Sequence, residues 1–348
     1  MSVNPKRPIM LLRASAWRTY TGGKLIDALH GLGDTEDTNF PEEWIMSTVS
    51  ARNSGREHIV EGLSMIKGTD ISLADFIEEN SELALGKKHI EKYGKKLGVL
   101  VKLIDSAERL TVQVHPTRSK AMDLFNSLYG KTECWHIIGG RAANGEKPSI
   151  YFGFKEGITR ERWKEIFEKQ DISAMLDCLH KFEVEEGDTF LIEGGIPHAI
   201  GAGCFLVELQ EPTDYTIRTE KVTPNGLEVS DFMCHQGLGF DKMFDCFDYN
   251  GYTREEILRR YRILPNGENI VSYDNTEMFR LTKKDICGEH SEIPDGQFYG
   301  IYVLSGSGKI DSVPVCSGSQ FFITSSCEQF KIEGDMTIMK LYGPKENV

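Results

Sequence analysis

Short strand-like segments separated by glycine-rich turns recur along most of this chain. They are clearest over residues 184–218, VEEGDTFLIEGGIPHAIGAGCFLVELQEPTDYTIR. Many short strands at near-regular spacing indicate a β sandwich or a β barrel. Two blocks share one rhythm of turn, strand, turn and strand: GDTFLIEGGIPHAIGAG at 187–203 and GSQFFITSSCEQFKIEG at 318–334. We therefore expect a mainly β protein with two related jelly-roll barrels, of which only the first keeps a histidine.

Two stretches break the β pattern with helical periodicity. Ser72 is a capping residue before an apolar-periodic run, which predicts a helix over 72–80 and a second one near 87–94. Apolar residues at helical spacing over about 159–181 predict a small two-helix insertion. A further helix is expected from residue 254, REEILRRY, whereas the opening stretch, including GGKLIDALHGLG, is expected to form only short strands.

These patterns predict two domains. The first, residues 1–250, would contain the helical segments at 72–94 and 159–181, and the second, residues 251–348, would be the other β block. A chain of 348 residues is long enough for both.

The composition narrows the class of protein. A net charge of −13 argues against nucleic acid or an anionic membrane surface as the main partner, while leaving room for a phosphorylated small molecule. No stretch of about 18 apolar residues or long signal-peptide core occurs, so we expect neither a membrane span nor a secretory leader. None of the eight cysteines forms a CxxC pair, which is typical of reduced thiols in a cytoplasmic protein.

The residues between 110 and 136 carry the chemistry. Gln113 and His115 are expected on one face of a strand, since side chains alternate, and Glu133 opens the next strand. A later histidine, His198, follows a tight Gly-Gly-Ile-Pro turn. Two histidines and a carboxylate without a thiolate fit a catalytic zinc ion better than a structural one. With the neutral amide as a fourth ligand, the centre would keep a net positive charge and favour an oxygen-rich anionic substrate.

Several motifs occur in one order along the chain: VQVHP (112–116), GKTECW (130–135), PHAIG (197–201) and ELQEPTDYTIR (208–218). Together with VKLID (101–105) and EEWIMSTVSARNSG (42–55), they resemble type I phosphomannose isomerase in its short bacterial form, from about residue 8 to 240. The resemblance implies cupin-type barrels, one zinc ion per chain, and the interconversion of mannose 6-phosphate and fructose 6-phosphate through an enediolate.

The resemblance also implies roles for individual residues. The zinc ligands would be Gln113, His115, Glu133 and His198. Lys131 would take part in proton transfer and Arg218 would face the reacting carbons. Lys102 would be a substrate contact near the metal. The loop after His115 departs from the family pattern, and we predict Thr111, Arg118 and Ser119 as contacts of the phosphate. The base stays open between Lys131, a zinc-bound hydroxide and Glu133.

Other interpretations of the same residues stay open. Two histidines and a carboxylate also form the triad of non-haem iron oxygenases. A regulatory cupin could bind a sugar phosphate without turning it over. Lys102 and Arg218 could simply pair with some of the 53 acidic residues. We expect a phosphorylated hexose as the partner molecule and a monomer or homodimer as the assembly.

Overall fold

The computed structural model describes residues 3–53, 55–56 and 58–346. Its strands pair antiparallel in three sheets, which confirms the mainly β class. The six-stranded sheet has the order β2 (Ala14–Ala16), β3 (Glu42–Ile45), β4 (Leu100–Asp105), β11 (Cys204–Gln210), β6 (Glu133–Gly140), β9 (Thr189–Ile192). The five-stranded sheet has the order β12 (Ile217–Arg218), β5 (Gln113–Val114), β10 (His198–Ile200), β7 (Ser149–Phe154), β8 (Leu179–Glu183).

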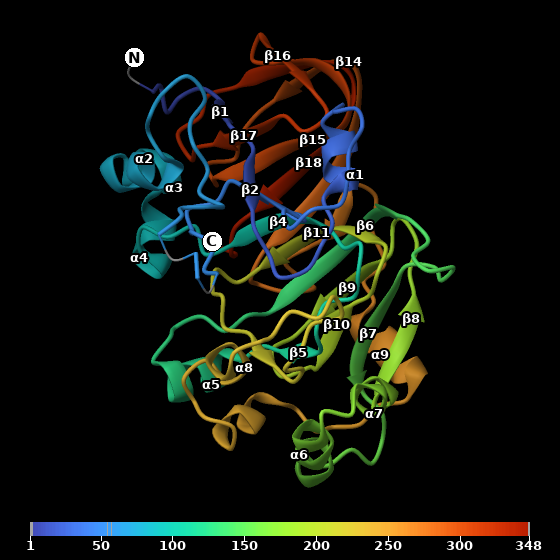
Figure 1. Ribbon diagram of the computed structural model, residues 1–348. Coiled ribbons are helices and arrows are strands. Elements are labelled where there is room, and N and C mark those ends of the chain that lie inside the picture. Colours follow the sequence, from blue (N-terminus) through green and yellow to red (C-terminus); the bar gives the residue numbers. More distant parts are fainter. Residues whose placement is uncertain (1–2, 54, 57, 347–348) are drawn as a thin grey trace.

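The third sheet is formed mainly by the end of the chain, at the top of Figure 1. Its order is β1 (Ile9–Leu11), β17 (Gln320–Ile323), β15 (Tyr299–Ile310), β18 (Phe330–Tyr342), β14 (Arg280–Glu292), β13 (Asn269–Val271), with β16 (Val313–Cys316) paired to β15. Because β1 pairs with β17, this sheet combines both ends of the chain. The domain boundary near residue 250 stays a prediction. The pairing among described strands closes none of the three sheets into a barrel.

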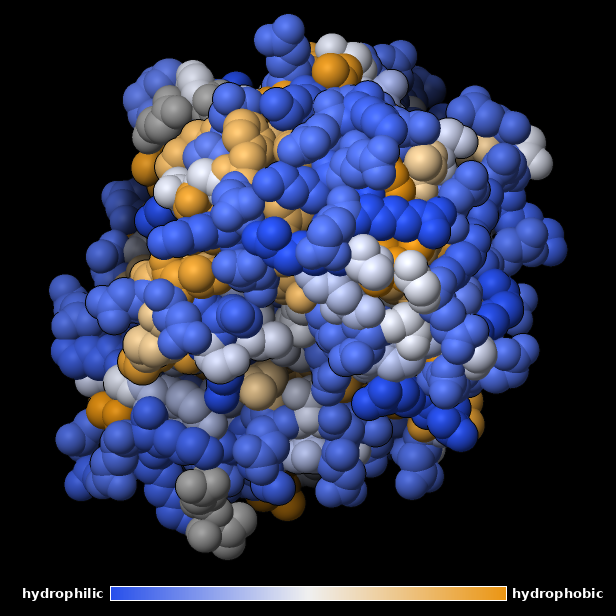
Figure 2. Space-filling model, turned by 90° about the horizontal axis from the view of Figure 1, so that it is seen from below, coloured by the Kyte–Doolittle hydropathy of each residue, from blue (hydrophilic) through white to orange (hydrophobic). Residues whose placement is uncertain are grey.

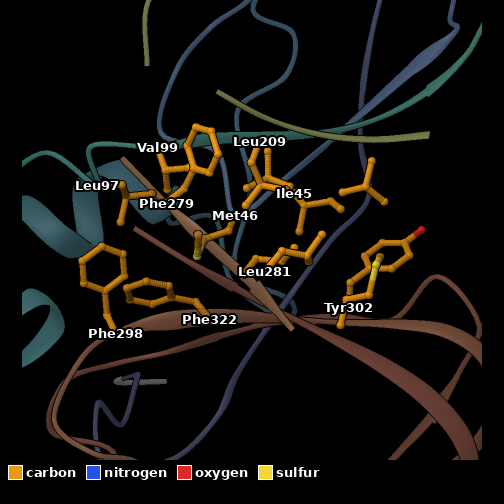
Figure 3. Close-up of a cluster of buried hydrophobic side chains, with 14 of the residues drawn as sticks. Ile45, Met46, Leu97, Val99, Leu209, Phe279, Leu281, Phe298, Tyr302 and Phe322 are labelled. Atoms are coloured by element: carbon orange, nitrogen blue, oxygen red, sulfur yellow. The ribbon is translucent and has the colours of Figure 1, made fainter. Parts of the chain in front are cut away.

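Apolar side chains join the sheets into layers. One cluster fills the space between the six-stranded and five-stranded sheets and includes Trp135 and Phe152. A larger cluster lies between the six-stranded and seven-stranded sheets, where Figure 3 shows Ile45 and Leu209 packing against Leu281. The six-stranded sheet is therefore buried on both faces, and its charged side chains need partners inside the protein.

The helices surround these sheets. They are α1 (Lys24–Leu29), α2 (Leu73–Glu79), α3 (Ser81–Leu85), α4 (Lys87–Tyr93), α5 (Arg118–Phe125), α6 (Arg160–Lys169), α7 (Ile172–Asp177), α8 (Asp231–His235) and α9 (Arg254–Tyr261), with a 3₁₀ turn η1 (Lys242–Cys246). The predicted helices near 72–80, 87–94, 159–181 and 254 are confirmed by α2, α4, the pair α6 and α7, and α9. Ser72 accepts a hydrogen bond from the backbone of Asp75, as its capping role required.

One helix contradicts the sequence predictions, and another forms where no helix was predicted. Residues 24–29 form α1 instead of a strand, because Gly23 adopts the left-handed conformation that starts the turn and Ile26 is buried. The loop after His115 contains α5, whose first turn is capped by Thr117 through a hydrogen bond from the Lys120 backbone.

The surface and the thiols agree with the composition. Figure 2 shows one face as mostly hydrophilic, with apolar residues in small separate groups. Among the described residues, no helix combines the length and apolarity needed to cross a bilayer. All eight cysteines are free thiols.

Candidate active site

Three of the four predicted metal ligands converge at one point between the sheets. The Nε2 atoms of His115 and His198 and the carboxylate of Glu133 lie within 4.8 Å of one another. His115 Nε2 is 3.1 Å from one oxygen of Glu133, and His198 Nε2 is 3.7 Å from the other. Strand pairing places His198, at the start of β10, directly opposite Gln113 in β5. Glu133 opens β6 in the six-stranded sheet and reaches the same point from there.

Gln113, the fourth predicted ligand, lies beside this group. Its amide nitrogen is 3.4 Å from His198 Nε2. A half-turn of the amide would bring its oxygen to this place, since the two atoms exchange positions in such a flip. His136, three residues after Glu133 in β6, is not part of this group, and its Nδ1 lies 2.9 Å from the Thr189 hydroxyl.

The hydrogen bonds of the two histidines prepare them for a metal ion. His115 Nδ1 lies 2.9 Å from the Tyr215 carbonyl, and His198 Nδ1 lies 2.8 Å from the Ile196 carbonyl. Each Nδ1 therefore carries the hydrogen, which leaves the lone pair of Nε2 directed at Glu133. Both buried oxygens of Glu133 have no hydrogen-bond partner among the described residues. A divalent cation would satisfy all these acceptors, so the side chains fit a metal ion.

The protonation states also suit a metal ion. Burial lowers the pKa of His198 to about 3, assisted by the charge of His115. Burial also lowers the pKa of His115, and the Lys131 ammonium lowers it further. Burial alone would raise the pKa of Glu133, but Lys131 and His115 hold it well below its ordinary value. Neutral imidazoles and an ionised carboxylate are the forms that bind metals.

A cleft with about 760 Å³ of empty volume, part of it open to solvent, lies over this cluster. Gln113 and Lys131 belong to its wall. Six cationic side chains line it: Arg18, Arg52, Lys102, Arg109, Lys131 and Arg218. Three carboxylates line it as well: Glu42, Glu208 and Asp214. This excess of cationic over anionic lining side chains next to the candidate metal site suits an anionic ligand.

The three predicted cations near the metal all reach the cleft. Lys131 Nζ is 2.9 Å from Glu133 and 3.2 Å from His115 Nε2. Lys102 is buried in an otherwise apolar strand and donates to Glu208 at 2.9 Å, so it forms the kind of ion pair considered in the sequence analysis. Arg218 is paired with Gln113 across β12 and β5, and it donates to the carbonyls of Thr216 and Met233.

The predicted phosphate contacts divide into two groups. Thr111 lines the cleft. Arg118 and Ser119 begin α5 and are not among the lining residues. Arg118 instead donates to Glu211 at 2.6 Å. The structure therefore does not bring these two residues together with the others, and their role stays a prediction.

Several charged residues of the cleft were not among the predicted site residues. Glu42 accepts hydrogen bonds from Tyr20 at 2.7 Å and from Trp44 at 2.8 Å, and it pairs with Arg18 at 2.9 Å. Asp214 lies nearby; burial would raise its pKa, but Arg18 and Lys131 lead the cations that hold it low. Charged residues inside apolar strand segments, such as Glu42 in EEWI, were the available signal.

Comparison with known proteins agrees with this geometry. A family model described as phosphomannose isomerase type I, catalytic domain, matches residues 36–130. A mannose-6-phosphate isomerase of Streptococcus mutans is 33% identical over 263 residues, which cover 72% of this chain and 77% of that protein. The chain belongs to the type I phosphomannose isomerase family. It is an isomerase.

Further relatives of the family agree in sequence and in fold. A mannose-6-phosphate isomerase of Bacillus subtilis is 26% identical over 262 residues, covering 73% of this chain and 78% of that protein. The crystal structure of a mannose 6-phosphate isomerase from Bacillus subtilis superposes with a TM-score of 0.70 at 21% identity, over 97% of this chain and 99% of that one. The whole described chain thus has the fold of this family.

Proposed function

We propose that this chain is a zinc-dependent mannose-6-phosphate isomerase that interconverts mannose 6-phosphate and fructose 6-phosphate through an enediolate. The observation that carries the proposal is the buried cluster of His115, Glu133 and His198 beneath a cation-lined cleft. With Gln113, these residues would hold one zinc ion. When bound, zinc supplies Lewis acidity that orients sugar oxygens and polarises a carbonyl.

The residues of the cleft account for charge development during isomerisation. The reaction removes a proton from the carbon beside the carbonyl and returns it to the neighbouring carbon. Arg218 holds a half-buried guanidinium beside Gln113, where it can stabilise the oxyanion that develops on the sugar. One terminal nitrogen, Nη1, donates to two backbone carbonyls, so the group is positioned before the substrate arrives.

Two side chains are suited to move the proton. Asp214 stays ionised among the surrounding cations and can accept the carbon-bound proton. Lys131 carries only donors when it is charged, so it can donate to a sugar oxygen or return a proton. The oxygens of Glu133 are committed to the ligand cluster, which favours Lys131 and Asp214 as the proton-transfer groups.

The location and assembly are part of the same proposal. Eight free thiols support a cytoplasmic protein, since an oxidising compartment would favour disulfides. A sugar phosphate in the metabolite pool of the cytoplasm would be the substrate. A monomer or homodimer stays our prediction for the assembly.

The test compares metal content and turnover in matched variants. Purified protein is stripped of metal, reloaded with zinc, and assayed for fructose 6-phosphate with a coupling enzyme, while elemental analysis gives the zinc per chain. We expect one zinc per chain, activity only with metal, and loss of both in His198→Ala. The control is His290→Ala, because His290 lies in β14, outside the cleft.

Three results would contradict the proposal. The metal-free protein could turn over at the full rate, the zinc-loaded protein could bind mannose 6-phosphate without turnover, or the ferrous protein could consume oxygen. The second result would favour a regulatory binding protein and the third an iron oxygenase.

A further inference from the structure

Most cations of the cleft already have a carboxylate partner. In these pairs a nitrogen and an oxygen lie 2.6 to 2.9 Å apart, and the pairs are Arg18–Glu42, Lys102–Glu208, Arg109–Glu220 and Lys131–Glu133. An arginine that already makes paired hydrogen bonds to a carboxylate has few donors left for a second anion. Arg109, for example, gives both of its terminal nitrogens to Glu220.

Two arginines of the cleft have no such partner within the described part of the chain. Arg218 donates to the backbone carbonyls of Thr216 and Met233 beside the metal cluster. Arg52 is exposed, lines the cleft, and makes no ion pair or hydrogen bond to any described residue. Its full set of donors is free for a ligand.

The residue after Arg52 offers further donors. Asn53 also lines the cleft and is buried, with 8% of its surface exposed. Its side-chain oxygen accepts a hydrogen bond from Arg18 at 3.3 Å, whereas its amide nitrogen donates to no described group. Two consecutive residues that line the cleft thus carry a guanidinium and an amide N–H, both without acceptors among the described residues.

We propose that Arg52 and Asn53 form the subsite that binds the phosphate group of the substrate. The proposal rests on the proposed isomerase function, which places the reacting carbons at the metal cluster and Arg218. The phosphate is at the other end of the six-carbon sugar, so it belongs at a part of the cleft away from the metal. Arg52 is exposed, and a strongly hydrated dianion loses less solvation there than at the buried floor.

The chemistry of the pair fits phosphate better than it fits a neutral sugar oxygen. A guanidinium can bind two phosphate oxygens at once, and an amide N–H can bind a third. The subsite would therefore select phosphorylated sugars over free ones. Arg118, in contrast, already pairs with Glu211 and does not line the cleft.

The experiment removes each donor and measures phosphate recognition separately from turnover. Arg52→Gln deletes the charge, and Asn53→Asp keeps the oxygen that Arg18 contacts while replacing the amide by an anion. We expect each change to raise the KM for mannose 6-phosphate and the inhibition constant of inorganic phosphate by about tenfold or more, with kcat within about twofold. The kcat/KM for unphosphorylated mannose should not change, and Arg52→Lys should recover part of the loss.

Arg56→Gln is the matched control. Arg56 belongs to the same segment, but it pairs with Glu61 and lies over the Trp17 ring at 5.2 Å, and it is not a lining residue. Its KM and phosphate inhibition should stay near the wild-type values.

Two results would overturn the subsite: unchanged phosphate inhibition in Arg52→Gln, or an equal loss with mannose and with mannose 6-phosphate. If the wild-type protein proves not to be an isomerase, calorimetric titration with inorganic phosphate tests the subsite independently. Weaker phosphate binding in Arg52→Gln than in Arg56→Gln would then support it, and equal binding would refute it.

Discussion

Replacing Lys102 by methionine should destabilise this protein far more than an average substitution. Lys102 Nζ lies 2.9 Å from Glu208, both side chains are 5% exposed, and the second Glu208 oxygen accepts a hydrogen bond from Trp135 at 3.1 Å. In Lys102→Met, Glu208 would keep only the Trp135 bond and would face the charge of Glu133. Breaking a buried pair by removing one partner costs roughly 3–5 kcal/mol.

The loss of stability in Lys102→Met should depend on pH in a defined direction. Burial raises the pKa of Glu208, and the Glu133 charge adds to this effect, whereas Lys102 opposes it. Without Lys102, the folded state should therefore hold the Glu208 proton to a higher pH than the unfolded chain does. Stability then falls as pH rises from the unfolded pKa to the raised folded pKa. The stability of Lys102→Met should be close to that of the wild type at acidic pH and should fall furthest below it at alkaline pH.

Thermal unfolding at about pH 5 and about pH 8 measures this effect. At roughly 2 °C per kcal/mol for a chain of this size, 3 kcal/mol lowers the melting temperature by about 6 °C at the higher pH. The double variant Lys102→Met with Glu208→Leu removes both charges and should recover most of the loss. A melting temperature of Lys102→Met equal to wild type at about pH 8, or no recovery in the double variant, would refute this reasoning.

Two further predictions concern an ion pair and a close backbone contact. Burial would raise the pKa of Glu42, but Arg18 leads the groups that hold it at about 2, so this stabilisation is present above pH 4.5 and lost as pH falls toward 2. In urea unfolding, the free energy of unfolding of the wild type should fall by on the order of 3 kcal/mol more than that of Glu42→Gln across this pH range. Parallel pH profiles of the two unfolding free energies would contradict this prediction. A Cβ on Gly194 would lie 2.7 Å from the carbonyl oxygen of Pro116, the residue after His115. Gly194→Ala should therefore lower zinc content and activity by about tenfold or more. The control is Gly33→Ala, whose Cβ meets nothing within 4 Å and which should change neither quantity. Equal zinc content in the two variants would exclude the contact as the cause.

The sequence predicted the metal cluster because local rules direct its side chains. Strand alternation and the turn before His198 give each group a direction relative to its neighbours in sequence. The distance between these segments came from the family resemblance, since no local rule pairs β5 with β10. Helix α5 was missed because its polar residues resemble a loop, although Thr117 supplied a capping signal.

The partners of the cleft cations could not be predicted in the same way. Glu42, Glu208 and Glu220 are separated from Arg18, Lys102 and Arg109 by 24, 106 and 111 residues, and each pair forms only when distant segments pack. In the sequence, every cation near the site is an equal candidate for binding phosphate, and Arg118 was predicted because it lies three residues after His115. In the structure, an arginine can anchor a substrate only if no carboxylate already occupies its donors. The pairing of charges in the fold, more than proximity to the motif, therefore decides which arginine can recognise the substrate.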